Sequence, residues 1–164
     1  MKKMNAALGP LWSTLNLNTR LFLNAVEGVG AEVALTRPNG NTNHIAFIGC
    51  HLTEARHYLG TCAGLETESP FKELTDPRTI EEVKALPALE EIRVAWTRVS
   101  EMLAERLPQL GESDLEREMK QPFPIEGGKT LLGCITFLLG HEAFHIGQIA
   151  LLRRYFGLEA MRYS

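Results

Sequence analysis

A long apolar segment, residues 131–152, restricts the folds open to this chain; it reads LLGCITFLLGHEAFHIGQIALL. It is long enough to span a membrane. Four polar side chains lie in its middle: His141, Glu142, His145 and Gln148. At the centre of a bilayer, one acidic side chain alone costs about 2.5–3.5 kcal/mol. A helix buried inside a soluble protein avoids this cost, so we expect a core helix and no membrane partner.

Local signals mark both ends of this helix. Thr130 is a typical N-cap residue, and Gly157 is typical of the position just after a helix. Apolar residues repeat with the helical period in three further long segments. These segments are residues 10–27, 43–60 and 88–107, and a short helix is expected at 78–85. No segment alternates as strands do. The pattern predicts an all-α protein, a four-helix bundle forming a single domain over residues 1–164.

The charge and the cysteine content of the chain indicate which binding partners and which cellular compartment to expect. The formal net charge is -3 and the pI about 6.0, which gives no electrostatic reason to expect nucleic acid as a partner. The three cysteines, an odd number, form neither a CxxC pair nor a disulfide framework. A reducing compartment is the simplest interpretation, and Gly9-Pro10 interrupts the only stretch that resembles a signal peptide. We therefore expect a cytoplasmic protein.

Two histidines of the long helix are spaced to bind one metal ion. Side chains at positions i and i+4 lie one turn apart on the same side of a helix, so His141 and His145 can reach one ion. His51 is the third candidate ligand, because it lies at the centre of the apolar face of the helix expected at 43–60. Three imidazoles and an open position suit zinc, nickel or iron. Alternatively, the pair are core histidines bonded to the backbone or to Gln148.

Residues 141–145 also match H-E-x-x-H, the pattern of zinc metalloproteases. In one large protease class a glycine and a third histidine follow, but Gln148 and Leu151 stand at those positions. Other such proteases use a glutamate on a further helix, whereas Glu159 falls just after the expected helix end. A metalloprotease is therefore the minor alternative. Glu142 either flanks the metal or forms a surface or inter-helix ion pair.

Two segments resemble the DinB/YfiT-like superfamily: NHIAFIGCHL at residues 43–52 and HEAFHIGQIALLRRYFG at residues 141–157. The resemblance implies a four-helix bundle of unusual connectivity, a metal held by His51, His141 and His145, and frequent homodimers. The superfamily includes thiol-dependent S-transferases and a hydrolase-like isomerase. Its name does not imply DNA binding.

These observations predict a metal-dependent enzyme acting on a small-molecule substrate, with a low-molecular-weight thiol as one such partner. The metal would lower the pKa of water or of a thiol, and S-transfer or hydrolysis would follow. Candidates for orienting ligands or substrate are Glu142, Gln148 and Tyr58. The alternative is a non-catalytic metal-binding or stress-response module.

Two further features of the helices lead to expectations about packing. Gly133, Gly140 and Gly147 recur every seven residues on one face, which indicates close approach by another helix of this chain or of a dimer partner. Arg56 and His57 fall outside the apolar face of their helix, so we expect His57 to be solvated.

Overall fold

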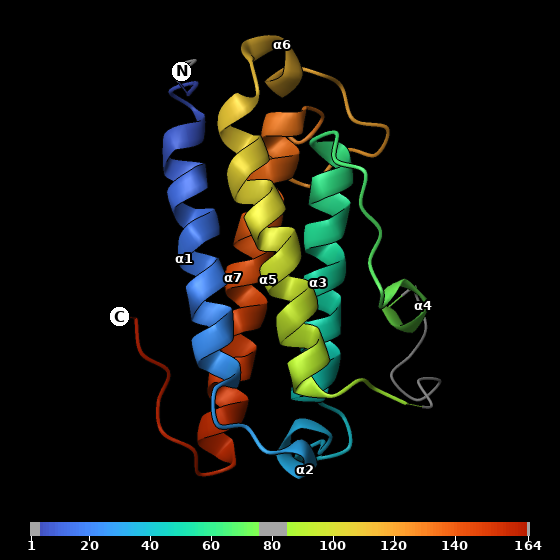
Figure 1. Ribbon diagram of the computed structural model, residues 1–164, viewed down its shortest axis with the longest axis vertical. Coiled ribbons are helices and arrows are strands. Elements are labelled where there is room, and N and C mark those ends of the chain that lie inside the picture. Colours follow the sequence, from blue (N-terminus) through green and yellow to red (C-terminus); the bar gives the residue numbers. More distant parts are fainter. Residues whose placement is uncertain (1–3, 76–84, 164) are drawn as a thin grey trace.

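The chain is all-α in the computed structural model, which describes residues 4–75 and 85–163. Four long helices run side by side (Figure 1): α1 (Leu8–Val26), α3 (Ile45–Cys62), α5 (Leu89–Arg106) and α7 (Leu131–Tyr155). Their bounds lie within about two residues of the predicted ones, as is usual for helix ends. The described residues include no β-strand, only an isolated bridge between Glu118 and Thr130.

Among the described residues, the short helices that join the long ones are α2 (Ala31–Ala34), α4 (Lys72–Thr75), the 3-10 helix η2 (Leu107–Gln109) and α6 (Glu112–Leu115). Each spans about one turn, too few residues for a periodic pattern to identify. Residues 78–84 of the predicted short helix lie outside the described part of the chain. Residue 85, its last predicted residue, is not helical.

The four long helices run in two opposite directions. In Figure 1, α1 and α7 run one way and α3 and α5 the other. Because α3 and α5 are consecutive and parallel, the chain between them must return along the length of the molecule. Helix α7 contacts both α1 and α3, and α5 contacts the same two helices. This order sets the histidine face of α7 against α3.

The core forms where the apolar faces of the helices meet. On α5 the inward side chains Ile92, Trp96, Val99 and Leu103 are all 0% exposed, as their spacing predicted. Each such burial contributes about 1.5–3 kcal/mol of hydrophobic stabilisation.

Both predicted ends of α7 are confirmed. Thr130 Oγ1 accepts a hydrogen bond from the Gly133 backbone N–H at 3.2 Å, which satisfies one of the free donors of the first turn. Gly157 has φ +79°, a left-handed conformation that costs glycine little.

The glycines of α7 do not share one cause. A side chain on Gly133 would meet the carbonyl oxygen of Gly127 at 2.2 Å, so the close neighbour is the turn at 127–128 and not a helix. The expectation of a helix contact was therefore wrong at Gly133. A side chain added at Gly140 or Gly147 would meet no atom of the described residues within 4 Å, apart from the local backbone of α7, and both glycines are exposed.

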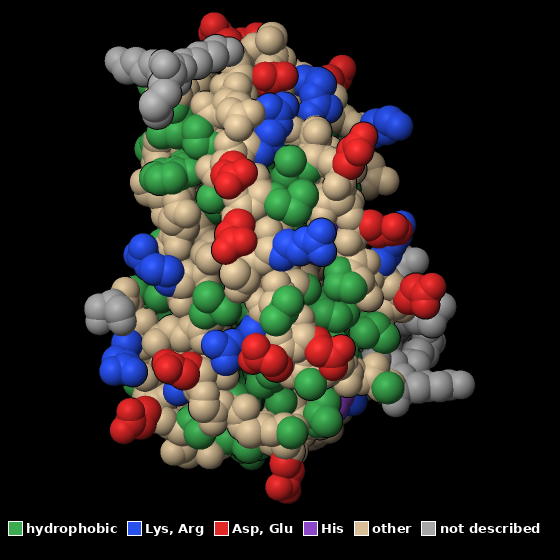
Figure 2. All heavy atoms as spheres, viewed as in Figure 1, with side chains coloured by type: hydrophobic (Ala, Val, Ile, Leu, Met, Phe, Trp, Pro, Cys, Tyr) green, Lys and Arg blue, Asp and Glu red, His purple; other side chains and the backbone are tan. Residues whose placement is uncertain are grey.

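Surface composition fits the modest net charge. On the face over α1 and α5, basic and acidic side chains lie interspersed (Figure 2). Among the described residues, α7 is the one helix whose length and composition would allow it to cross a membrane, and 39% of its most apolar window is buried in the protein. Core helices of soluble proteins pass the same test.

Candidate metal site

The packing of α7 against α3 brings three histidines together. His141 Nε2 lies 3.1 Å from His51 Nε2 and 3.0 Å from His145 Nε2. The ligand nitrogens all lie within 4.8 Å of one another, and the three side chains are half-buried. These three residues could therefore hold a metal ion. No other His, Cys, Asp or Glu of the described residues joins the group.

The spacing and ionisation of the three rings suit a metal. Zinc binds histidine nitrogen at about 2.0–2.1 Å, and tetrahedral geometry then separates two nitrogens by about 3.3 Å. Burial, with a further contribution from the charges of His145 and His141, lowers the pKa of His51 to about 4. Burial also lowers the pKa of His141. Both rings are thus neutral at pH 7, the form that binds metals.

Gln148 controls the orientation of one ring. Its Oε1 lies 2.6 Å from His145 Nδ1. Because an amide oxygen only accepts, Nδ1 carries the proton and donates it, and Nε2 keeps a free lone pair directed at the other histidines. His141 lacks such support: its Nδ1 is buried and has no hydrogen-bond partner among the described residues.

Glu142 is directed away from this group. Its carboxylate is 1% exposed and accepts hydrogen bonds from Arg56 Nε at 2.8 Å and Arg56 Nη2 at 3.0 Å. Asn18 Nδ2 donates to the same carboxylate at 3.1 Å. With its oxygens bound in this way, Glu142 does not flank the histidines and is not available as a general base. It forms an inter-helix ion pair. The glutamate of the H-E-x-x-H pattern is therefore not placed to act as the general base that a metalloprotease needs.

Arg56 connects all four long helices, a role that sequence reasoning missed. It is 0% exposed, although we expected the polar side of α3 there. Its guanidinium donates to Thr19 Oγ1 at 2.6 Å on α1 and to Ser100 Oγ on α5, and it lies 3.7 Å from the centre of the Trp96 ring. An arginine can be buried when its N–H groups are satisfied. Helical periodicity sorts residues by polarity only, so it could not identify this partner set.

Tyr58 lies in a separate cluster. Its ring centre is 6.3 Å from that of Phe123, and its hydroxyl is hydrogen-bonded with Cys62. Burial and this contact raise the pKa of Tyr58 to about 12. Cys134 is 0% exposed and also bonds to Cys62. Hydrogen bonds from Cys134 and Tyr58 lower the pKa of the Cys62 thiol to about 7. The hydroxyl of Tyr58 is therefore bound to the Cys62 thiol, and the described residues show no hydrogen bond or ring contact between Tyr58 and the three histidines.

The other two histidines lie apart from the site. His44 occupies the N-cap position of α3. His57 is only 8% exposed, so the expectation that it is solvated was wrong; its Nδ1 lies 2.7 Å from Thr67 Oγ1.

Comparison with known proteins agrees with this arrangement. No curated protein matches the chain. A family model described as the DinB superfamily matches residues 14–149, a span that contains His51, His141 and His145. Because the match covers most of the sequence, the chain belongs to the DinB superfamily.

Proposed function

We propose that this protein is a metal-dependent enzyme, a thiol-dependent S-transferase or a hydrolase, built on the four-helix bundle of the DinB/YfiT-like type. The observation that carries the proposal is the convergence of the Nε2 atoms of His51, His141 and His145 from two helices. Zinc or nickel fits three imidazoles best, and iron is also compatible.

The number of ligands favours catalysis over a purely structural role. Structural zinc sites are normally closed by four protein ligands, whereas catalytic sites have three and an open position. Only three ligands gather among the described residues. A divalent ion held in this way acts as a Lewis acid and lowers the pKa of a water or thiol at the open position.

The residues around the histidines have assignable tasks. Gln148 fixes the proton of His145 on Nδ1. The Phe137 ring stacks near His141 with ring centres 6.1 Å apart, and Phe123 lies 4.8 Å from Phe137. These rings limit the water around one side of His141 and offer an apolar wall to a substrate.

Metal analysis and turnover test the proposal together. Protein purified without chelator and reloaded with zinc or nickel should hold about one ion per chain. His145→Ala should lose the ion. His44→Ala, which removes a histidine outside the site, should keep it. Turnover is then assayed with low-molecular-weight thiols plus electrophiles, and with simple esters and amides.

Two results would change the assignment. Wild-type protein that holds no metal after reloading contradicts the histidine site itself. Metal retained by wild type without turnover on any of these substrates favours a non-catalytic metal-binding or stress-response module.

A further inference from the structure

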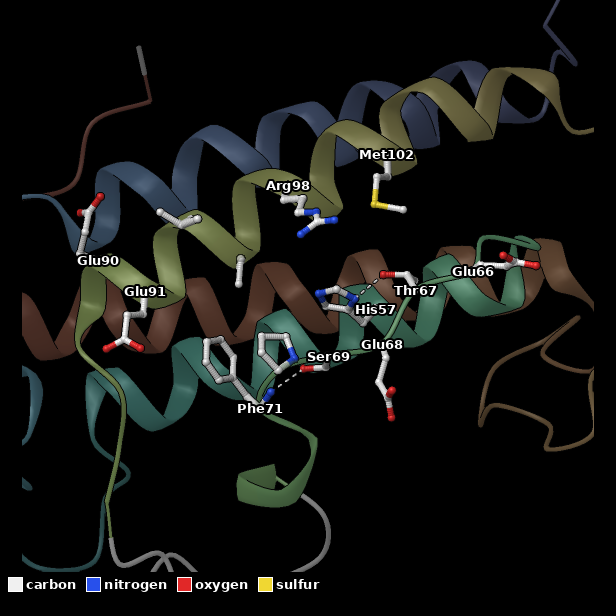
Figure 3. A pocket seen from close by; sticks show the side chains of 13 residues that line it. His57, Glu66, Thr67, Glu68, Ser69, Phe71, Glu90, Glu91, Arg98 and Met102 are labelled. Carbon is white, nitrogen blue, oxygen red and sulfur yellow. Dashed lines mark hydrogen bonds between the residues drawn. The ribbon is translucent and has the colours of Figure 1, made fainter.

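A cavity separate from the histidine site lies between α3, α5 and the segment that follows α3. Its volume is about 760 Å³, within the range of small-molecule sites, and Figure 3 shows the side chains around it. None of the three clustered histidines lines it. His57 does, from a side of α3 about 120° away from His51 at 100° per residue.

His57 has an unused nitrogen in this cavity. The side chain is 8% exposed and its Nδ1 is occupied by Thr67 Oγ1 at 2.7 Å. Its Nε2 is buried and has no partner among the residues that the structure describes. Leaving such a buried group unsatisfied is unfavourable, and a bound acceptor would remove this cost.

Arg98 faces the same space from α5. In Figure 3 its guanidinium extends from α5 toward the side on which His57 lies. Arg98 forms no ion pair or hydrogen bond with the described residues. Ser69 adds a third donor, because its Oγ accepts from the Phe71 backbone N–H at 3.1 Å and its hydroxyl proton stays available.

The four acidic residues around the cavity are all exposed to solvent, which screens their charges, and three of them bind groups outside the cavity. Glu68 pairs with Lys72 at 3.7 Å and Glu90 with Arg93 at 3.5 Å. Glu91 Oε1 accepts from the backbone N–H of Ala88 at 3.2 Å, at the start of α5. The fourth, Glu66, is exposed. Arg98, His57 and Ser69 are thus the lining residues whose donors remain available: His57 and Ser69 are buried, and Arg98 lies at the exposed rim.

We propose that this cavity binds a small organic monocarboxylate with an apolar body. The carboxylate lies between the Arg98 guanidinium and His57 Nε2–H, and the apolar body lies against Phe71, Val94 and Met102. The site goes beyond the metal chemistry proposed above and does not depend on it.

The protonation of His57 should respond to this ligand class. Burial, and then the charge of Arg98, lower the pKa of His57 from its ordinary value. The free protein therefore holds a neutral imidazole at pH 7. An anion bound beside it favours the charged form, so ligand binding must raise the pKa of His57.

The test uses the metal-free full chain, octanoate, and octanamide as a neutral analogue. Calorimetry gives the Kd, and NMR of the His57 ring gives its pKa. Arg98→Met should weaken octanoate binding about 10- to 100-fold and leave octanamide binding unchanged. Arg93→Met, an arginine on the same helix that pairs with Glu90, should leave octanoate binding unchanged.

Octanoate should also raise the pKa of His57 in the wild type and bind unchanged to His145→Ala. Equal binding of octanoate and octanamide would overturn the proposal. So would equal effects of Arg98→Met and Arg93→Met, an unmoved His57 pKa, no octanoate binding at millimolar concentration, or loss of binding in His145→Ala.

Discussion

At His145, one hydrogen bond decides which nitrogen is available to a metal. Gln148 Oε1 lies 2.6 Å from Nδ1 and keeps the lone pair on Nε2. Gln148→Ala should weaken zinc binding about 10- to 100-fold. Gln148→Glu keeps an acceptor at the same reach and should restore most of the affinity. Competition with a chromophoric chelator measures both, and a Gln148→Ala protein with wild-type affinity would contradict the orienting role.

Cys62 should be the most reactive thiol of the three. Its pKa is lowered to about 7 by hydrogen bonds from Cys134 and Tyr58, whereas burial raises the pKa of Cys50 to about 12. The thiolate is the nucleophile, so alkylation of Cys62 should increase as pH rises from about 6 to 8, and Cys50 should stay unmodified. Mass spectrometry after iodoacetamide locates the label. Faster labelling at Cys50 than at Cys62 would contradict the prediction.

At the scale of helices, a buried ion pair holds α3 and α7 in register behind the histidines. Arg56 and Glu142 are 0% and 1% exposed, and Glu142 directly follows His141. Arg56→Met leaves the carboxylate buried without its cation, which should destabilise the fold by about 3–5 kcal/mol. The double variant Arg56→Met with Glu142→Met should recover much of this loss. Urea unfolding measures each free energy.

The exposed pair of Arg93 and Glu90 provides the control for this loss. Its N–O distance is 3.5 Å and the side chains of Arg93 and Glu90 are 43% and 74% exposed, so Arg93→Met should cost less than about 1 kcal/mol. If Arg56→Met were no more destabilising than Arg93→Met, the buried pair would not anchor the helices.

Helices α3 and α7 show which features of the fold and of the site could be predicted from the sequence. Helix positions were predictable because caps such as Thr130 and apolar spacing act locally. The approach of His51 to His141 was expected because three inward imidazoles need partners. Arg56 and His57 were misplaced, because their burial depends on partners from other segments, Glu142 and Thr67, that no local pattern reveals.

At the scale of the whole molecule, one side of α7 is not covered by the residues that the structure describes. Phe144 is 64% and Leu151 71% exposed, and Gly140 and Gly147 beside them have open space above. A large exposed apolar strip with small residues allows another helix to approach closely. The resemblance to the DinB/YfiT-like superfamily also implies homodimers, and α7 against its own copy would give a two-fold contact.

We therefore expect the protein to sediment at twice its chain mass of 18.3 kDa. Leu151→Glu should produce a monomer, because a two-fold contact would bring two carboxylates into an apolar surface. Val94→Glu is the matched control: Val94 is 61% exposed on α5, away from α7, so this variant should remain a dimer. A wild-type monomer at high protein concentration, or a Leu151→Glu dimer, would show that this side of α7 does not join two copies. His51, His141 and His145 all come from one chain, so metal binding should survive in a monomeric Leu151→Glu protein.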